Sequence, residues 1–570
     1  MHRLQRSVRA LVRELTNGDS DPVFFVIVAA SLVLCGYHLT WGLPNGNNSW
    51  ANDALGPLSV LNVAKRSLST FNSGWFWYKY PFGYPLLLLA VYAPYLAWLV
   101  ATGQLKNPST IYPYGFADAE SALYTLALLG RCLNLVLIVG TVVLTYAIGH
   151  RLLGRSTARL AAWFVVTAYP IVYYAHTTNQ DAAYLFWLTL CVWATIVCAQ
   201  GVEKRWPFVV LGAAAAMAMA TKEQGFALLL ALPIVLVPSL YGAQPASRAR
   251  GRRAWRAVWN RGTRAALVAA VVTMLIASNA IVNPQGVVNR FLDLTGHPIK
   301  GLSSRLTPLK FSLFKGVEKE LFYLRQLGDV TESSFGLPLL IVAVAGVVYL
   351  LWAQRRAATF LLVPALAYYF ISLRTHDLLV LRYALPLFPI LAVVAAAVCV
   401  AWIGRMRTIG MAVVSLLCLL GLARAIEVDF LMRTDSRYQA EAWVAQHVPA
   451  GSSVEFYQKP VYAPRFPALQ ARQIPLEERT IAGIENRRPD LIVVSSASRK
   501  GITHLWNPDW TKGSLMIERP AARTFLDALE SGKLSYQRVA EFSQQPKLLR
   551  LRITSLCPRI TLYRRKADNS

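Results

Sequence analysis

Long apolar stretches recur along most of this 570-residue chain, and they limit its fold more than any other feature. They begin at Pro22 and return until about Arg424, each roughly 17 to 25 residues long, the length that crosses a bilayer core as a helix. Beyond that point the chain becomes polar. The sequence therefore predicts an α-helical polytopic membrane protein that is followed by a separate C-terminal domain.

The formal net charge of +28 raises the question of a nucleic-acid partner, and the placement of the basic residues answers it. They lie mainly before the first apolar stretch and in short loops between stretches, with seven arginines between Arg248 and Arg264. This is the positive-inside pattern of membrane proteins. We therefore expect no nucleic-acid partner. Six of the seven cysteines lie in apolar stretches, so no disulfide framework is expected.

Loop charge also sets the topology. The run 83–102 follows Pro81 and contains Pro94, and if it crossed the membrane the arginine-rich loops would face outside. We therefore expect it to lie along or dip into the outer leaflet. The predicted outer segments are 44–120, 175–181, 284–335 and 374–383. About eleven spans are predicted, at 22–43, 121–148, 158–174, 182–199, 207–221, 225–241, 265–283, 336–353, 357–373, 384–403 and 408–426.

Three regions follow from this topology. Residues 1–21 form a basic cytoplasmic N-terminus with a retained signal anchor after it, and 22–426 form the membrane domain with a large first outer loop at 44–120. Residues 427–570 form an extracytoplasmic α/β domain. The pattern in this domain predicts a helix and three strands, at 437–447, 453–457, 491–495 and 560–563.

Two outward motifs carry acidic residues. Asn52-Asp53 precedes a helical stretch in the first outer loop, and His176 and Asp181 lie in the short segment between two spans. A carboxylate at the hydrocarbon boundary is costly without a partner, which favours a functional site. Asn and Asp also cap helices, so a purely structural role is the alternative for both motifs.

Two outward motifs carry basic residues. Lys222 interrupts two apolar runs, and it either contacts a ligand or reaches the interface beside its neighbour Glu223. Arg382 opens a span on the outer side, against the charge bias of the other loops. It requires an anion, which is either a lipid phosphate at headgroup depth or the nearby Asp377.

The order of these motifs resembles the GT-C superfamily of polyprenyl-phosphate-sugar-dependent glycosyltransferases, in the branch of protein O-mannosyltransferases and the lipid A aminoarabinose transferase. The resemblance covers about residues 20–425, and the tail is similar only in kind. The family often carries Asp-Glu in the first outer loop, where this chain has Asn52-Asp53. The matching pieces, in order, are Asp53, Tyr78–Pro85, Gly130-Arg131, Gly149–Gly154, Pro170–Asp181, Thr221–Gly225 and Arg382-Tyr383.

The resemblance implies a sugar transfer in which a polyprenyl phosphate leaves as a stable anion. No general acid is then needed, and one base that takes the acceptor proton suffices, with inversion at the anomeric carbon. The implied base is Asp53, and Asp181 is a second catalytic residue that orients His176 or the acceptor. The implied lipid-phosphate ligands are Lys222, Arg382, Tyr383 and Lys79, and the residues that contact or orient the acceptor are His176, His376 and Asn52.

The resemblance also implies partners and location. The partners are a polyprenyl-phosphate sugar donor, membrane lipids, and a glycan, lipid or protein acceptor at the inner membrane. No metal ligands are assigned, although a paired acid in the first loop would allow a divalent metal. A polytopic transporter or lipid flippase is the alternative, but it would show repeated halves and ionisable groups at the bilayer midplane.

Overall fold

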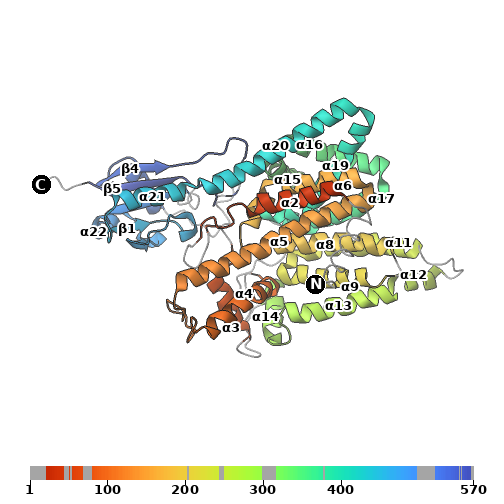
Figure 1. Ribbon diagram of the computed structural model, residues 1–570, viewed down its shortest axis with the longest axis horizontal. Helices are drawn as coiled ribbons and strands as arrows, with labels where there is room; N and C mark the ends of the chain where they lie inside the picture. Colours follow the sequence, from red (N-terminus) through yellow and green to blue (C-terminus); the bar gives the residue numbers. More distant parts are fainter. Residues whose placement is uncertain are drawn as a thin grey trace. The chain divides into compact units, whose positions relative to one another are not determined.

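A computed structural model describes residues 21–43, 50–51, 54–68, 80–201, 204–242, 250–297, 316–375, 379–496, 520–550, 553 and 555–566. The chain divides into two compact units. The first contains Met1–Leu39 and Leu55–Ile426, and the second contains Thr40–Ala54 and Glu427–Ser570. Figure 1 shows helices throughout the first unit and a sheet with helices in the second. The polar tail thus groups with a stretch of the first predicted outer loop.

The first unit is built of helices, most of them rich in Leu, Val and Ala. Two predicted spans, 158–174 and 225–241, each consist of two shorter helices, α6 with α7 and α10 with α11. The elements are α2 (Pro22–Gly36), α3 (Pro57–Leu68), α4 (Gly83–Ala101), α5 (Ala119–Leu153), α6 (Arg155–Val166), α7 (Tyr169–Ala175), α8 (Asp181–Gln200), α9 (Trp206–Thr221), η1 (Glu223–Gly225), α10 (Phe226–Leu229), α11 (Leu232–Gly242), α12 (Arg250–Val258), α13 (Arg261–Ala277), α14 (Pro284–Leu294), α15 (Val317–Phe335), α16 (Leu337–Ala353), α17 (Arg355–Ile371), η2 (Leu373–Thr375), α18 (Leu381–Ala384), η3 (Leu385–Leu387), α19 (Phe388–Arg405) and α20 (Arg407–Arg433), which continues into the second unit.

Six helices in the described part of the chain are long and apolar enough to cross a membrane, or seven if the bent pair α15–α16 is one span. Helix α13 also carries apolar side chains on its outer surface, where Val268, Val271 and Val272 are at least half exposed. Such a surface suits contact with lipid rather than water. The prediction of a helical multi-pass membrane protein is confirmed, and the number of eleven crossings stays a prediction.

Small residues let neighbouring helices approach closely. A Cβ atom on Gly212 of α9 would lie 2.0 Å from the carbonyl oxygen of Ala266 on α13, so only glycine fits there. Four residues earlier on both helices, Phe208 packs against Gly262. The matching direction shows that α9 and α13 run parallel, side by side as in Figure 1. Their C-terminal ends therefore lie at the same end of the unit.

Helix α4 packs against α5. The amide of Asn134 on α5 donates to the carbonyls of Thr177 and Asn179, in the segment between α7 and α8. Tyr84 of α4 donates to the same Asn134 at 2.9 Å, and Tyr92 packs near Gly130 on α5. Helix α4 is one continuous helix and is among the helices that are long and apolar enough to cross a membrane, so the expectation that 83–102 stays on the outer side remains a prediction.

The predicted cytoplasmic end has its own polar anchor. Asp21 caps α2, accepts hydrogen bonds from Tyr146 and Arg159, and is fully buried. The Arg159 guanidinium, more than any other contact, lowers the pKa of Asp21 to about 2. The contacts of Asp21 connect α2 to α5 and α6. Removing Arg159 would leave the Asp21 charge buried without its partner, which is strongly destabilising.

The second unit contains a five-stranded sheet in the order β2-β1-β3-β5-β4. β1 pairs in parallel with β2 and β3, and β5 pairs antiparallel with β3 and β4. The α/β tail is therefore confirmed, including the predicted helix and all three predicted strands. The elements are α21 (Ser436–His447), β1 (Ser453–Phe456), η4 (Pro460–Tyr462), β2 (Gln470–Gln473), η5 (Leu476–Glu478), α22 (Ile481–Arg487), β3 (Leu491–Ser495), α24 (Pro520–Glu530), β4 (Tyr536–Phe542) and β5 (Ile560–Arg565).

Both faces of this sheet are covered. Leu491 and Val493 of β3 pack in a cluster with residues of α21, whereas Ile492 and Val494 pack in a cluster with residues of α22 and α24. Successive side chains of a strand point to opposite faces, so one buried strand serves both clusters. This explains why β3 reads as a continuous apolar run in the sequence.

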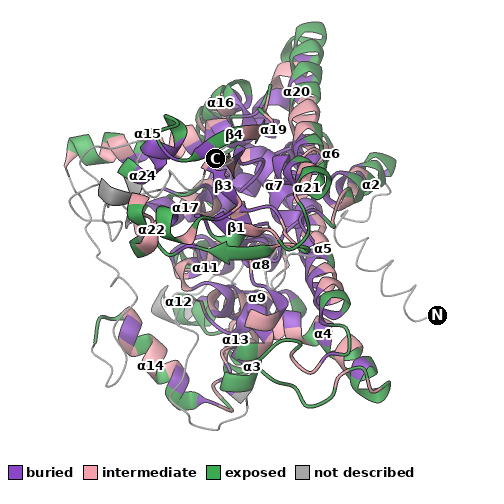
Figure 2. Ribbon diagram, turned by 90° about the vertical axis from the view of Figure 1, so that its left-hand side faces the viewer, coloured by how far each residue is buried: buried purple, intermediate pink, exposed green. Residues whose placement is uncertain are grey.

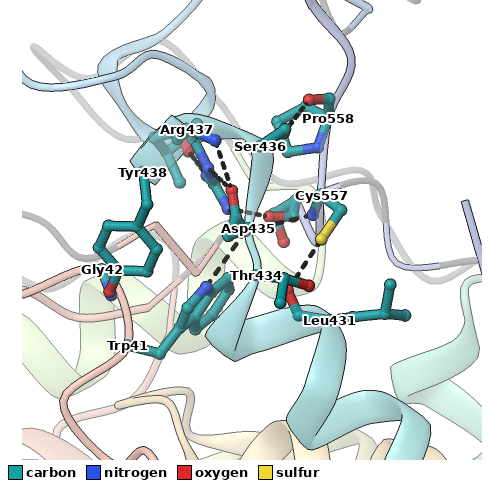
Figure 3. A network of polar contacts seen from close by, with 12 residues as sticks. Trp41, Gly42, Leu431, Thr434, Asp435, Ser436, Arg437, Tyr438, Cys557 and Pro558 are labelled. Carbon is teal, nitrogen blue, oxygen red and sulfur yellow. Dashed lines mark hydrogen bonds and ion pairs between the residues drawn. The ribbon is translucent and has the colours of Figure 1, made fainter. Parts of the chain in front are cut away.

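A buried ion pair within the second unit contacts Trp41, at the end of the first predicted span (Figure 3). Asp435 caps α21 and pairs with Arg437, with Oδ2 and Nη2 2.6 Å apart. Trp41 donates to the same carboxylate at 3.2 Å, and the guanidinium of Arg437 lies 4.1 Å from the ring centre of Trp50. Residues on both sides of 44–49 thus fold with the tail, which the sequence pattern did not predict.

Candidate functional site

The structure brings together three of the charged residues predicted from separate motifs. Lys222 Nζ lies 2.7 Å from Asp181 Oδ1, and Arg382 Nε lies 4.0 Å from Asp181 Oδ2. Their side chains are 5%, 16% and 1% exposed for Lys222, Arg382 and Asp181. We call this group the Asp181 cluster. It joins a carboxylate to two cations in a largely buried place.

Helix ends create the Asp181 cluster. Asp181 is the first residue of α8, Lys222 directly follows α9, and Arg382 lies on the short α18 before α19. An acid in the first turn of a helix is favoured by the helix dipole. The backbone N–H of Asp181 donates to Asn179 Oδ1 at 2.9 Å, and the N-cap residue of α8, Gln180, makes no capping hydrogen bond with its side chain. The carboxylate of Asp181 does not cap α8 but binds Lys222.

Tyrosines surround the cations. The Lys222 ammonium lies 4.7 Å from the ring centre of Tyr383 and 5.4 Å from that of Tyr184. The Arg382 guanidinium is 5.5 Å from the same Tyr383 ring. Tyr368 donates to the Tyr383 carbonyl at 2.9 Å and so holds this segment in place. Tyr383, predicted as a phosphate ligand, therefore contacts both cations through its ring face, an attractive cation–π arrangement.

His176 is buried away from the carboxylate it was expected to meet. Its ring nitrogens face the carbonyls of Val172, at 2.7 Å, and Tyr37. Burial lowers the pKa of His176 to about 4, against the two carbonyl contacts that favour the charged ring. Asp181 pairs with Lys222 instead, so the expected orientation of His176 by Asp181 is not what the structure shows. His176 links α7 to the end of α2.

Further polar groups fix the segment 177–179 before Asp181. The amide of Asn134 binds two of its carbonyls, as described above, and Thr178 exchanges hydrogen bonds with Leu55, at 2.8 Å through its hydroxyl and 3.1 Å through its carbonyl. Figure 2 shows α7 and α8 as mostly buried, in agreement with this dense packing. Sequence analysis missed Asn134. An Asn inside an apolar helix is costly in lipid unless it is hydrogen-bonded, so its position in an apolar stretch could have marked Asn134 as a residue with a polar partner.

Two more ion pairs involve residues near Lys222 and Arg382 in the sequence. Glu223 pairs with Arg290 of α14 rather than with Lys222, which corrects the alternative that paired the neighbours Lys222 and Glu223. Arg374 of η2 pairs with Glu320 of α15, and its side chain is 3% exposed. Both pairs join the end of one helix to α14 or α15. They were not predicted, because their members lie more than 50 residues apart.

Four predicted site residues lie outside the described residues: Asn52, Asp53, Lys79 and His376. Asp377, the alternative partner of Arg382, is also outside them. Their roles stay predictions. Within the described ranges, no group of three or more His, Cys, Asp or Glu residues is arranged to hold a metal ion.

The Asp181 cluster has the charges needed to bind an anion. Two cations face one carboxylate in a place largely shielded from water. Lys222 has three N–H donors and uses one for Asp181. Within the described part of the chain, Oδ2 of Asp181 accepts no hydrogen bond although it is buried.

Comparison with known proteins gives one family match. Residues 127–247, which include Asp181 and Lys222, match the family model described as dolichyl-phosphate-mannose-protein mannosyltransferase. No curated protein sequence matches the chain.

Solved structures with similarity to the chain include ArnT from Cupriavidus metallidurans bound to undecaprenyl phosphate, at 13% identity, TM-score 0.47, and coverage of 95% of this chain and 97% of that one. An oligosaccharyltransferase from Archaeoglobus fulgidus has 11% identity, TM-score 0.43, and coverage of 84% and 68%. The S. cerevisiae O-mannosyltransferase complex Pmt1-Pmt2 has 14% identity, TM-score 0.32, and coverage of 46% and 34%. The resemblance to GT-C glycosyltransferases, predicted from the motifs, is confirmed by the family match over residues 127–247.

Proposed function

We propose that this protein transfers a sugar from a polyprenyl-phosphate carrier to an acceptor hydroxyl at the outer face of the membrane. The Asp181 cluster is the observation that carries the proposal. A membrane protein has little reason to bury two cations around one carboxylate at a helix end unless an anion binds there. The family match over the segment that holds Asp181 and Lys222 supports the same activity.

Lys222 and Arg382 are the proposed phosphate ligands. During transfer, negative charge grows on the phosphate oxygen as its bond to the anomeric carbon breaks. Fixed cations near that oxygen stabilise the transition state more than the ground state, which is how they accelerate the reaction. Tyr383 holds both cations in place through its ring. Lys79 is proposed as a further phosphate ligand from its motif alone.

A single carboxylate base completes the proposed chemistry. The acceptor oxygen attacks the anomeric carbon, the bond from that carbon to the phosphate oxygen breaks, and its electron pair leaves with the polyprenyl phosphate. The acceptor proton passes to Asp53, the proposed base, and the anomeric configuration inverts. The departing phosphate needs no proton, so a second carboxylic acid is not required.

Asp181 has a second proposed task. It holds Lys222 with Oδ1, and its buried Oδ2 is placed to accept a hydrogen bond from a hydroxyl of the substrate. Asn52 and His376 are proposed to contact or orient the acceptor from their sequence positions. The acceptor itself is a protein hydroxyl, a lipid or a glycan. The proposed location is the inner membrane with the C-terminal domain on the outer side.

The test uses two lysines at opposite ends of α9, Lys222 just after it and the exposed Lys204 just before it. Cells with and without the protein are compared for sugars on their glycolipids and cell envelope, and the sugar that depends on the protein identifies the product. Lys222→Ala should reduce this product about 100-fold at normal protein level, the size of effect seen when one transition-state donor is lost. Lys204→Ala should leave it unchanged.

Full product formation by Lys222→Ala would contradict the proposal. A transporter makes a different prediction: purified protein in liposomes would move a labelled sugar carrier across the bilayer without transferring the sugar. That result would replace the transferase with the alternative class.

A further inference from the structure

Helix α12 lies at the end of the first unit opposite the Asp181 cluster. Its Ala257 is fully buried in a cluster with Cys198 of α8, Phe208 of α9 and Leu240 of α11, and Figure 1 shows α12 next to α11. Asp181 begins α8, and the helix extends about 26 Å along its axis from there to Cys198. This length is close to the thickness of a bilayer core. Helix α12 therefore lies near one membrane surface when the Asp181 cluster lies near the other.

The helix is short and firmly held. Its nine residues extend only about 14 Å, which is too short to cross a membrane. The amide of Asn260 donates to the carbonyl of Ala257 at 3.0 Å, and the hydroxyl of Thr263 donates to the carbonyl of Val258 at 2.7 Å. Asn260 also caps α13 with its side-chain oxygen. These contacts satisfy two carbonyls at the end of α12 and fix the corner between α12 and α13.

Large apolar side chains are exposed along this corner. Trp255 is 64% exposed, and Val258 and Trp259 are each nearly half exposed. The rings of Trp255 and Trp259 are stacked, with their centres 6.1 Å apart. Helix α13, which follows, exposes Leu267 and Val268 as well. Tryptophan is enriched at the boundary between lipid and water, so this apolar surface suits the membrane interface.

The same segment is strongly basic. Arg256, Arg261 and Arg264 are exposed, and they belong to the run of seven arginines in the sequence. The sequence contains no acid between Glu223 and Asp293 that could neutralise them locally. Clusters of arginine beside a membrane attract anionic lipid headgroups, and the guanidinium binds phosphate oxygens through paired N–H groups. The charge therefore favours a lipid with an anionic headgroup over a neutral one.

A lipid surface accounts for both features of α12 at once. Headgroup phosphates meet the arginines, and the upper parts of the acyl chains meet the apolar side chains. A soluble acidic partner would match the charge, but the exposed apolar residues continue onto α13, whose own surface suits lipid. The combination therefore points to the membrane itself as the partner.

We propose that α12 lies in the membrane–water interface and binds anionic phospholipids in the leaflet opposite the Asp181 cluster. Trp255 and Trp259 lie at the level where headgroups and acyl chains meet, and Arg256 and Arg264 bind the phosphates. The inference does not depend on the proposed transferase function. Lipid bound here fixes the depth of one end of α8 and thereby the depth of Asp181 at its other end.

The test compares two pairs of exposed arginines, Arg256 with Arg264 beside α12, and Arg355 with Arg356 at the start of α17. Native mass spectrometry of the purified full-length protein gives dissociation constants for phosphatidylglycerol and phosphatidylcholine. The wild type should bind phosphatidylglycerol more tightly. Arg256→Gln combined with Arg264→Gln should weaken it about 25-fold, about fivefold for each charge lost, and should leave phosphatidylcholine unchanged. Arg355→Gln combined with Arg356→Gln should bind both lipids as the wild type does.

A second measurement locates the tryptophans. The full-length protein is placed in vesicles whose lipids are brominated close to the headgroup, where bromine quenches nearby indole fluorescence. Trp255→Phe combined with Trp259→Phe should lower the quenched fraction of the total tryptophan fluorescence, because two quenched rings are removed. An unchanged or larger quenched fraction would place both rings in water and overturn the inference.

The binding experiment can also contradict the inference in several ways. Phosphatidylglycerol bound equally well after loss of Arg256 and Arg264 would remove the site from α12. Equal weakening of phosphatidylcholine by the same change would show contact without recognition of the anionic headgroup. Undecaprenyl phosphate is the third lipid tested: its weakening by this change, with phosphatidylglycerol unaffected, would assign the surface to that carrier instead of a phospholipid.

Discussion

Asp181 accepts a hydrogen bond from Lys222 across 41 residues of sequence, with Oδ1 and Nζ 2.7 Å apart and both side chains almost fully buried. The pair joins the first residue of α8 to the residue after α9. A buried charge that loses its partner is strongly destabilising. The contact therefore fixes the geometry of two helix ends at the same time as it sets the charge of the site.

The first prediction tests the direct pairing of Asp181 and Lys222 by a double-mutant cycle. Asp181→Asn and Lys222→Met should each lower the free energy of unfolding by about 3–5 kcal/mol, because each removes one partner of a buried ion pair. The double variant should be less destabilised than the sum of the two. Thermal unfolding of the purified protein measures this, with the exposed Lys204→Met as control. Additive effects of the two changes would contradict a direct pair.

A second prediction concerns how Arg382 is positioned. Glu320 of α15 pairs with Arg374, and Gln326 of the same helix accepts from the Leu379 N–H at 2.7 Å. Helix α15 thus holds the chain on both sides of 376–378, shortly before Arg382. Glu320→Gln should weaken binding of undecaprenyl phosphate about tenfold to a hundredfold through misplacement of Arg382.

The control for this change is Glu318→Gln, an exposed acid two residues earlier on α15. It should bind the carrier as the wild type does. Glu320→Asp should restore part of the affinity because it keeps the charge. Equal binding by Glu320→Gln and Glu318→Gln would show that α15 does not position Arg382.

Helix packing gives a third prediction. A Cβ on Gly346 of α16 would lie 2.3 Å from the carbonyl oxygen of Val394 on α19, whereas Gly404 of α19 has no atom within 4 Å of its added Cβ. Gly346→Ala should cost about 1–3 kcal/mol by overpacking. Gly404→Ala should gain up to about 1 kcal/mol from helix propensity. Melting temperatures that move the same way for both variants would contradict the close approach.

Much of the fold was predictable because it depends on local patterns. Apolar run length predicted the helical membrane unit, and alternating or continuous apolar residues predicted β1, β3 and β5. Strand β2 was missed because Gln470–Gln473 contains a single apolar residue and is fully exposed at the sheet edge. Its backbone pairing with β1, rather than its side chains, makes it a strand.

The sequence predicted several residues of the candidate site but not which of them form ion pairs. The interruption of two apolar runs pointed to Lys222, the charge bias of the loops pointed to Arg382, and the cost of a carboxylate at the boundary pointed to Asp181. Which groups meet depends on contacts between distant helix ends, so the Glu223–Arg290 and Glu320–Arg374 pairs were not predicted. The same limit applies to Trp41 and Trp50, whose grouping with the tail has no local signal in the sequence.

A fourth prediction follows from the buried His176. Its pKa is lowered to about 4 in the folded protein, against about 6.5 in an unfolded chain. Between these values the unfolded state binds the extra proton, so stability should be full above about pH 6.5 and should decrease as pH falls toward 4. His176→Gln should flatten this dependence of the melting temperature, while the exposed His297→Gln should not. A pH dependence unchanged by His176→Gln would assign it to other groups.

The last prediction tests the ion pair of the second unit. Asp435 and Arg437 are both fully buried, whereas Arg472 and Glu478 form a pair that is 58% and 40% exposed in the same unit. Arg437→Met leaves the Asp435 charge buried without its partner and should cost about 3–5 kcal/mol. Arg472→Met should cost no more than about 1 kcal/mol, because water screens an exposed pair. The ring of Trp50 lies against the Arg437 guanidinium, so only the first change should also alter tryptophan fluorescence. Equal stability losses in the two variants would show that the buried pair does not hold the second unit together.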